Sequence, residues 1–230
     1  MGESIPFATV LAASVHDMKN SIGMVVHLIE ELRAQLDPDD PGCAQLQFET
    51  ARLNNYLMQL MVLYKLEQQQ YRFNSEECYL DEFIEDLVLM NLPLLTPRGV
   101  TVRQQVEADL CWSFDAQLVQ GALSNILTNL IRYADGRVAV SAERVQLAAN
   151  AEQGGLVIRV EDDGPGFPDE MLGVLEGEAM GVDFIGGSTG FGLYFAQQVA
   201  AAHRVGERGG EVRLSNGGSL GGGCFELFLP

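Results

Sequence analysis

Residues 160–167 read VEDDGPGF and residues 188–193 read STGFGL, and these two glycine-rich stretches decide how the second half of the chain is interpreted. The first stretch follows residues 156–160, whose β-branched content predicts a buried strand. The second directly precedes residues 191–203, which predict a helix. Glycine lets a backbone approach a ligand closely, and a helix N-terminus offers N–H groups and a positive dipole end. Taken alone, the first stretch is better interpreted as an ordinary turn, and the second is weak evidence for ligand binding.

A third stretch, LSNILTNLIRY at residues 123–133, places a polar line on an otherwise apolar helix. Asn125, Asn129 and Arg132 stand at positions i, i+4 and i+7, so they share one helix face. An amide oxygen can ligate Mg²⁺, and the guanidinium of Arg132 can reach a phosphate. In the first stretch, the carboxylate of Asp162 can accept a hydrogen bond from the exocyclic amine of adenine. The alternative is that the two asparagines are helix caps or buried polar residues.

In this order and at these separations, the three stretches resemble the N, G1 and G2 boxes of histidine kinases. Histidine kinases belong to a larger family of ATPases that also includes DNA gyrase, the Hsp90 chaperone and the MutL repair protein. The resemblance covers about residues 74–230 and implies the Bergerat-type ATP-binding fold, with ATP and Mg²⁺ as cofactors. It implies that Asn129 coordinates Mg²⁺ beside its companion Asn125, that Arg132 and Tyr133 lie near the nucleotide, and that Asp162 reads adenine. The residues that it assigns to the adenine pocket and the triphosphate are Gly164, Gly166, Gly190, Phe191, Gly192 and Leu193.

Two long helices are predicted upstream, because apolar residues recur at three- and four-residue steps in residues 7–36 and 43–69. The sequence DPDDPG at residues 37–42 breaks this pattern, so the short connection implies an antiparallel hairpin. Two helices cannot cover both apolar stripes, and we expect the hairpin to form a four-helix bundle in a homodimer.

Strand and helix patterns alternate after residue 75. The elements expected there are helices at residues 80–95, 115–134 and 191–203 and strands at residues 100–102, 137–145, 156–160, 211–215 and 224–229. The prediction is an α+β protein, with the dimerisation and phosphotransfer hairpin at residues 1–72 and an α/β sandwich that binds ATP at residues 73–230.

The first predicted helix contains ASVHDMKNS at residues 13–21. This string resembles the H box of histidine kinases, in which an acidic residue follows the His and Asn or Thr stands four positions after it. We therefore expect His16 to accept a phosphoryl group, with Asp17 orienting the imidazole and taking its proton. By the same resemblance, Asn20 positions a water against an acyl phosphate on a docked response regulator. The alternative is a surface histidine on an amphipathic helix.

The formal net charge of −18 opposes binding to nucleic acid or to an anionic membrane surface. No apolar run is long enough to span a bilayer, and the four cysteines form no CxxC pair. We therefore expect a cytoplasmic protein that does not insert into the membrane. Residues 167–189, the expected ATP lid, contain acidic side chains and no Lys or Arg. Because acidic side chains cannot neutralise phosphates, we predict weak nucleotide affinity with a strong dependence on Mg²⁺.

The leading functional prediction is a histidine kinase that autophosphorylates His16 from Mg-ATP and then transfers the phosphoryl group to an aspartate of a response regulator receiver domain. Because 15 residues precede His16, we expect the input signal to arrive through a separate sensory protein or the regulator itself. The alternatives are a phosphotransferase or phosphatase with a weakened ATP site, a non-catalytic dimeric module that sequesters a regulator, and a chaperone- or repair-type ATPase.

Overall fold

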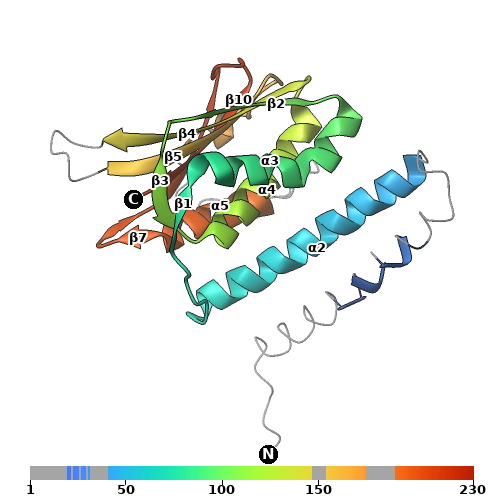
Figure 1. Ribbon diagram of the computed structural model, residues 1–230, viewed down its shortest axis with the longest axis horizontal. Coiled ribbons are helices and arrows are strands. Elements are labelled where there is room, and N and C mark those ends of the chain that lie inside the picture. Colours follow the sequence, from blue (N-terminus) through green and yellow to red (C-terminus); the bar gives the residue numbers. More distant parts are fainter. Residues whose placement is uncertain are drawn as a thin grey trace, which may run out of the picture. The chain divides into compact units, whose positions relative to one another are not determined.

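The computed structural model describes residues 20–21, 23–25, 27–29, 31, 41–146, 154–174 and 190–230 (Figure 1). The chain divides into two compact units, Met1–Arg72 and Phe73–Pro230. None of the helices in the described part combines the length and apolarity that a bilayer span requires.

The described part of the first unit is helical. Helix α2 spans Pro41–Glu67, and proline at its first position suits a helix start because that N–H has no partner within the helix. The second predicted helix is therefore confirmed, beginning two residues earlier than expected. Of the first predicted helix, the residues described between 20 and 31 are helical. On α2, the apolar side chains of Leu53 and Met58 are exposed.

The second unit is built on a mixed six-stranded sheet with the order β2-β4-β5-β10-β9-β6. Strands β2 and β4 pair in parallel, and the other neighbours pair antiparallel. The strand bounds are β2 Thr101–Val106, β4 Arg137–Gln146, β5 Gly154–Asp162, β6 Gly173–Val174, β9 Glu211–Asn216 and β10 Gly223–Leu229. Two small ribbons complete the unit: β1 (Glu76–Tyr79) with β3 (Cys111–Phe114), and β7 (Arg204–Val205) with β8 (Arg208–Gly209).

Three helices cover one face of this sheet: α3 (Leu80–Leu95), α4 (Ala116–Tyr133) and α5 (Phe191–Ala202) (Figure 1). Helix α4 lies between α3 and α5 and also contacts β5. Short 3₁₀ turns follow at Thr96–Arg98 and Asp169–Met171. The α+β prediction and the sandwich predicted for the second part of the chain are confirmed.

The core lies between the helices and the sheet, and its position follows from the sequence pattern. Helix α4 buries pairs of apolar residues one turn apart, which gives it a continuous apolar stripe. These residues are Leu118, Val119, Ala122, Leu123, Ile126 and Leu127. Facing them, β5 buries Leu156, Ile158 and Val160, which alternate along the strand toward the helical layer. The stripe fixes the rotation of α4, and hence the direction in which its polar line points.

Candidate functional site

Helix α4 brings the predicted glycine stretches to the same side of the second unit. Asn125, in the middle of the helix, lies against Gly192 in the first turn of α5. A Cβ atom on Gly192 would lie only 2.0 Å from Nδ2 of Asn125, so a residue with a side chain there would displace the amide. At the end of the helix, a Cβ atom on Gly164 would lie 2.2 Å from the carbonyl oxygen of Tyr133. Both glycines are therefore required by close packing against α4.

The two contacts are separated by a distance that suits a nucleotide. Tyr133 follows Asn125 by eight residues, which corresponds to about 12 Å along a helix. Asn129, which is half-buried, stands one turn beyond Asn125 and one turn before Tyr133. A nucleotide with its adenine ring near Gly164 and its phosphates near Gly192 would therefore be extended and would pass Asn129.

Asp162, at the end of β5, is buried and held by backbone amides. It is 3% exposed, and its Oδ1 accepts a hydrogen bond from the amide of Gly164 at 2.7 Å. The amide of Gly223 also donates to its carboxylate. Burial raises the pKa of Asp162, and the charges of Asp163 and Asp135 add to this, while the two amide donors oppose it. A buried carboxylate held by two amides keeps acceptor capacity for a ligand donor.

Gly222 and Gly223 pack closely against Asp162, and sequence reasoning missed them. A Cβ atom on Gly222 would lie 2.5 Å from Oδ1 of Asp162, and one on Gly223 would lie 2.9 Å from Oδ2. The amide of Gly222 donates to the main-chain oxygen of Asp162 at 3.0 Å. The signal in the sequence was the glycine run before β10, but the pattern of apolar and polar residues predicts only a turn there.

The neighbouring carboxylate, Asp163, has a structural task. It accepts hydrogen bonds from the amides of Gly136 and Arg137 at 3.0 and 2.9 Å and pairs with the Arg137 guanidinium at 2.9 Å. These donors lower the pKa of Asp163 to about 2. Asp163 therefore stays ionised and fixes the turn after α4, next to Asp162.

Asn216 is a third residue that sequence reasoning missed. Its Oδ1 accepts the amide of Phe167 at 2.7 Å, and its Nδ2 donates to the Phe167 carbonyl at 2.8 Å. This pair of bonds, with the positive φ of 82° at Gly166, fixes the end of the VEDDGPGF stretch against β9. Strand β6 also pairs with β9, so residues 167–174 of the expected lid are attached to the sheet, and residues 175–189 lie outside the described residues.

The second glycine stretch begins α5. Gly190 precedes the helix, and its carbonyl accepts the amide of Tyr194 at 2.9 Å. Gly192 and Leu193 are buried and Phe191 is half-buried. The amides at this helix start are oriented to receive an anion.

The other predicted site residues are placed unevenly. Tyr133 is 43% exposed at the end of α4, and Arg132 is in the same helix, with its side chain outside the described part. His16 and Asp17 also lie outside the described residues. Asn20 is helical and exposed.

The residues present fit an adenine nucleotide with Mg²⁺. Nδ2 of Asn125 is buried and makes no hydrogen bond to the protein, which is costly for an amide unless a ligand satisfies it. Asp162 offers an acceptor for a ligand donor, and the glycines around it bring backbone close to its carboxylate. Within the described residues, His, Cys, Asp and Glu form no cluster of three that could hold a metal ion. The amide oxygen of Asn129 is of the type that Mg²⁺ prefers, and phosphate oxygens of a bound nucleotide would supply further ligands.

Comparisons with known proteins identify the family of the chain. Residues 114–230 match the family described as histidine kinase-, DNA gyrase B-, and HSP90-like ATPase. The sensor-like histidine kinase SenX3 of Mycobacterium tuberculosis is 27% identical over 224 residues, which cover 94% of this chain and 52% of SenX3. The chain thus spans about half the length of this curated relative.

Solved structures of histidine kinases share the fold. The Acinetobacter baumannii histidine kinase AdeS aligns with a TM-score of 0.58 at 17% identity, covering 93% of this chain and 96% of AdeS. Full-length ShkA, solved in complex with AMPPNP, aligns with a TM-score of 0.65 at 16% identity, covering 96% of this chain and 45% of ShkA.

Proposed function

The chain belongs to the family of histidine kinase-, DNA gyrase B-, and HSP90-like ATPases, and from this premise we propose that it autophosphorylates His16 from Mg-ATP and transfers the phosphoryl group to an aspartate of a response regulator. The observation that supports this proposal best is that both glycine stretches pack against α4, with the unpaired Nδ2 of Asn125 at one contact and buried Asp162 near the other. ATP would supply the phosphoryl group, and Mg²⁺ would neutralise its charge.

Each of the proposed site residues has a separate role in this reaction. Asp162 and its glycine walls bind and orient the adenine ring, while Asn129 offers the oxygen ligand for Mg²⁺. The amides at the start of α5 hold the phosphates. Asp17 keeps the proton on one imidazole nitrogen of His16, so that the other nitrogen is free to attack the phosphorus atom. Asn20 is exposed on its helix, which supports the proposed phosphatase role of positioning a water at a regulator's acyl phosphate.

The proposed partners are a second copy of the chain, the receiver domain of a response regulator and a sensory protein. The exposed apolar side chains of Leu53 and Met58 on α2 support the homodimer, because a lone hairpin leaves them in water. The free thiols of Cys78, Cys111 and Cys224 are compatible with the reducing cytoplasm expected from the sequence.

The test is incubation of the full chain with Mg²⁺ and ATP labelled at the γ-phosphate, followed by a search for acid-labile label on the protein. We expect label in the wild type and in His27→Gln, and none in His16→Gln. His27 is the matched control, because it is a helical, exposed histidine with Glu31 as its partner. Label that persists in His16→Gln would reject His16 as the acceptor.

A silent wild type tests the phosphatase alternative. In that case, dephosphorylation of a phosphorylated regulator that is lost in Asn20→Ala would replace the kinase proposal. If neither reaction occurs but the regulator still binds, the chain is a sequestering module.

A further inference from the structure

The start of the second unit is fastened to helix α4 by a carboxylate. The amide of Asn74, the second residue of the unit, donates to Oδ2 of Asp115 at 2.9 Å. The other oxygen of Asp115 accepts the amide of Leu118 at 3.1 Å, which caps the N-terminus of α4. The same side chain therefore holds both the beginning of the unit and the beginning of the helix that carries Asn125 and Asn129.

His203, directly after α5, joins this arrangement. The amide of Asp115 donates to Nε2 of His203 at 3.1 Å, and Nδ1 of His203 lies 2.7 Å from the carbonyl of Val199. Because Nε2 accepts, the proton must be on Nδ1, which donates to Val199. His203 is 5% exposed, and burial lowers its pKa, so the ring is neutral near pH 7.

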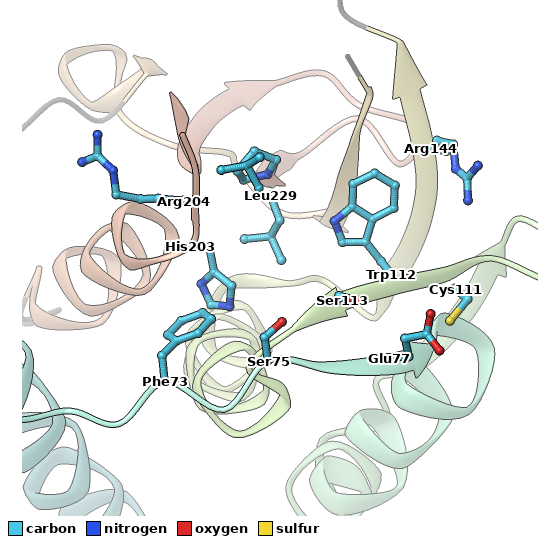
Figure 2. Close-up of a pocket in the computed structure, with 12 residues that line it drawn as sticks. Phe73, Ser75, Glu77, Cys111, Trp112, Ser113, Arg144, His203, Arg204 and Leu229 are labelled. Carbon is cyan, nitrogen blue, oxygen red and sulfur yellow. The ribbon is translucent and has the colours of Figure 1, made fainter. Parts of the chain in front are cut away.

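Phe73 completes the group. Its ring stands edge-on to the imidazole of His203, with 4.6 Å between the ring centroids. Figure 2 shows both rings side by side in the wall of a surface pocket. We call Phe73, Asn74, Asp115 and His203 the junction clasp, because they connect the first residues after Arg72 to the ends of α4 and α5.

The junction clasp is too far from the nucleotide site to touch a ligand there. Gly192 and His203 are separated by eleven residues, which corresponds to about 16 Å along α5. Asp115 precedes Asn125 by ten residues, or about 15 Å along α4. Any effect of the junction clasp on a reaction would therefore act through the direction in which the chain enters the second unit.

We propose that the junction clasp is a positioning device for phosphotransfer, which holds residues 73–74 rigidly on the two nucleotide-binding helices, so that the connection to the His16 unit starts in a fixed direction. This inference rests on the proposed kinase function. Transfer between a nucleotide and a side chain on another unit depends on orientation, and loss of a rigid connection lowers the fraction of time spent in the reactive geometry. Nucleotide binding, in contrast, uses only groups within the second unit.

The first test measures the rigidity of the junction without any activity. Trypsin can cleave the full chain after the exposed Arg72, and mass spectrometry identifies the products 1–72 and 73–230. We expect cleavage at Arg72 to be at least about five times faster in His203→Ala than in the wild type, since a held segment must open before a protease can bind it. In His203→Gln, whose amide oxygen can accept the Asp115 amide, we expect most of the protection to return. Arg98, also exposed, serves as the internal reference site.

The second test measures labelling of His16. In His203→Ala we expect the maximal rate to fall at least about tenfold while the KM for ATP stays within about twofold, and His203→Gln to restore most of the rate. A structural defect alone would raise KM or lower the melting temperature of the ATP-binding unit together with the rate. If His203→Ala does not fold, Phe73→Ala takes its place, because Phe73 is 41% exposed and outside the core.

Equal cleavage rates at Arg72 in the wild type and the clasp variant would overturn the inference, and so would a raised KM with an unchanged maximal rate. If the wild type is cleaved slowly at Arg72 but His16 never becomes labelled, the proposed kinase function is rejected. The faster cleavage of His203→Ala would then still establish the clasp, but its assigned role in phosphotransfer would fall.

Discussion

The contact between Gly192 and Asn125 predicts that Gly192→Ala changes the stability of the protein in a direction that depends on whether the Asn125 side chain is present. When Asn125 is present, the new methyl group of Gly192→Ala would lie 2.0 Å from its Nδ2, far inside van der Waals contact. Asn125 is 6% exposed and cannot move into solvent, and overpacking of this kind costs about 1–3 kcal/mol. In an Asn125→Ala background the amide is gone, and alanine is then favoured over glycine in a helix by up to about 1 kcal/mol.

The single substitution Asn125→Ala should itself change stability little. It removes a buried donor without a partner, whose burial costs about 1–3 kcal/mol, and it also removes the packing of the side chain, which costs a similar amount. We therefore expect Gly192→Ala to destabilise the wild type by about 2 kcal/mol and to leave Asn125→Ala unchanged or more stable. The resulting coupling energy of about 2 kcal/mol is within the range for residues in direct contact.

The assay is urea unfolding of the full chain followed by the fluorescence of Trp112, the single tryptophan, which lies in β3 and reports on the second unit. All four members of the cycle are compared at pH 7. Additive effects, with Gly192→Ala equally destabilising in both backgrounds, would refute the argument. Calorimetry with an ATP analogue adds a second criterion, because the double variant should recover stability without recovering nucleotide affinity.

Three further predictions follow from single contacts. Because burial lowers the pKa of His203, stability should fall as the pH drops below about 6.5, by up to about 1 kcal/mol at pH 5.5, and His203→Gln should lose this component in urea unfolding. Asp162→Asn should weaken binding of an ATP analogue at least about tenfold by calorimetry, since its NH₂ group would face amide donors. Asn216→Ala should speed hydrogen exchange at the Phe167 amide, since it removes the acceptor, and exchange at wild-type rates would contradict this.

The regular elements of the second unit could be predicted because their patterns are local. Helix α3 has the bounds expected from the sequence, and β10 differs by one residue at its start. The ribbon of β1 and β3 was missed, because EECY and CWSF are four residues long and show no clear alternation. They become strands by pairing with each other across more than thirty residues of chain, which no local pattern encodes.

The same distinction explains the candidate site. Asp162, Gly164 and Gly192 could be selected because they stand in short motifs with a fixed spacing. Asn216 is 49 residues from Phe167 and no motif marks it, so its two hydrogen bonds follow only from the antiparallel pairing that places the end of β9 beside that turn. Gly222 was visible as one glycine among several, but only the approach of Asp162 shows which glycine lacks room for a side chain.

Asp162 and Asp163 are adjacent, yet one is buried among glycines and the other is ionised against Arg137. Side chains alternate between the two faces of a strand, so a shift of β5 by a single position relative to β4 would exchange these carboxylates. Insertions and deletions within β5 should therefore be eliminated during evolution far more strictly than substitutions in the same strand. The length of β5, as much as the identity of either aspartate, preserves the buried position of Asp162.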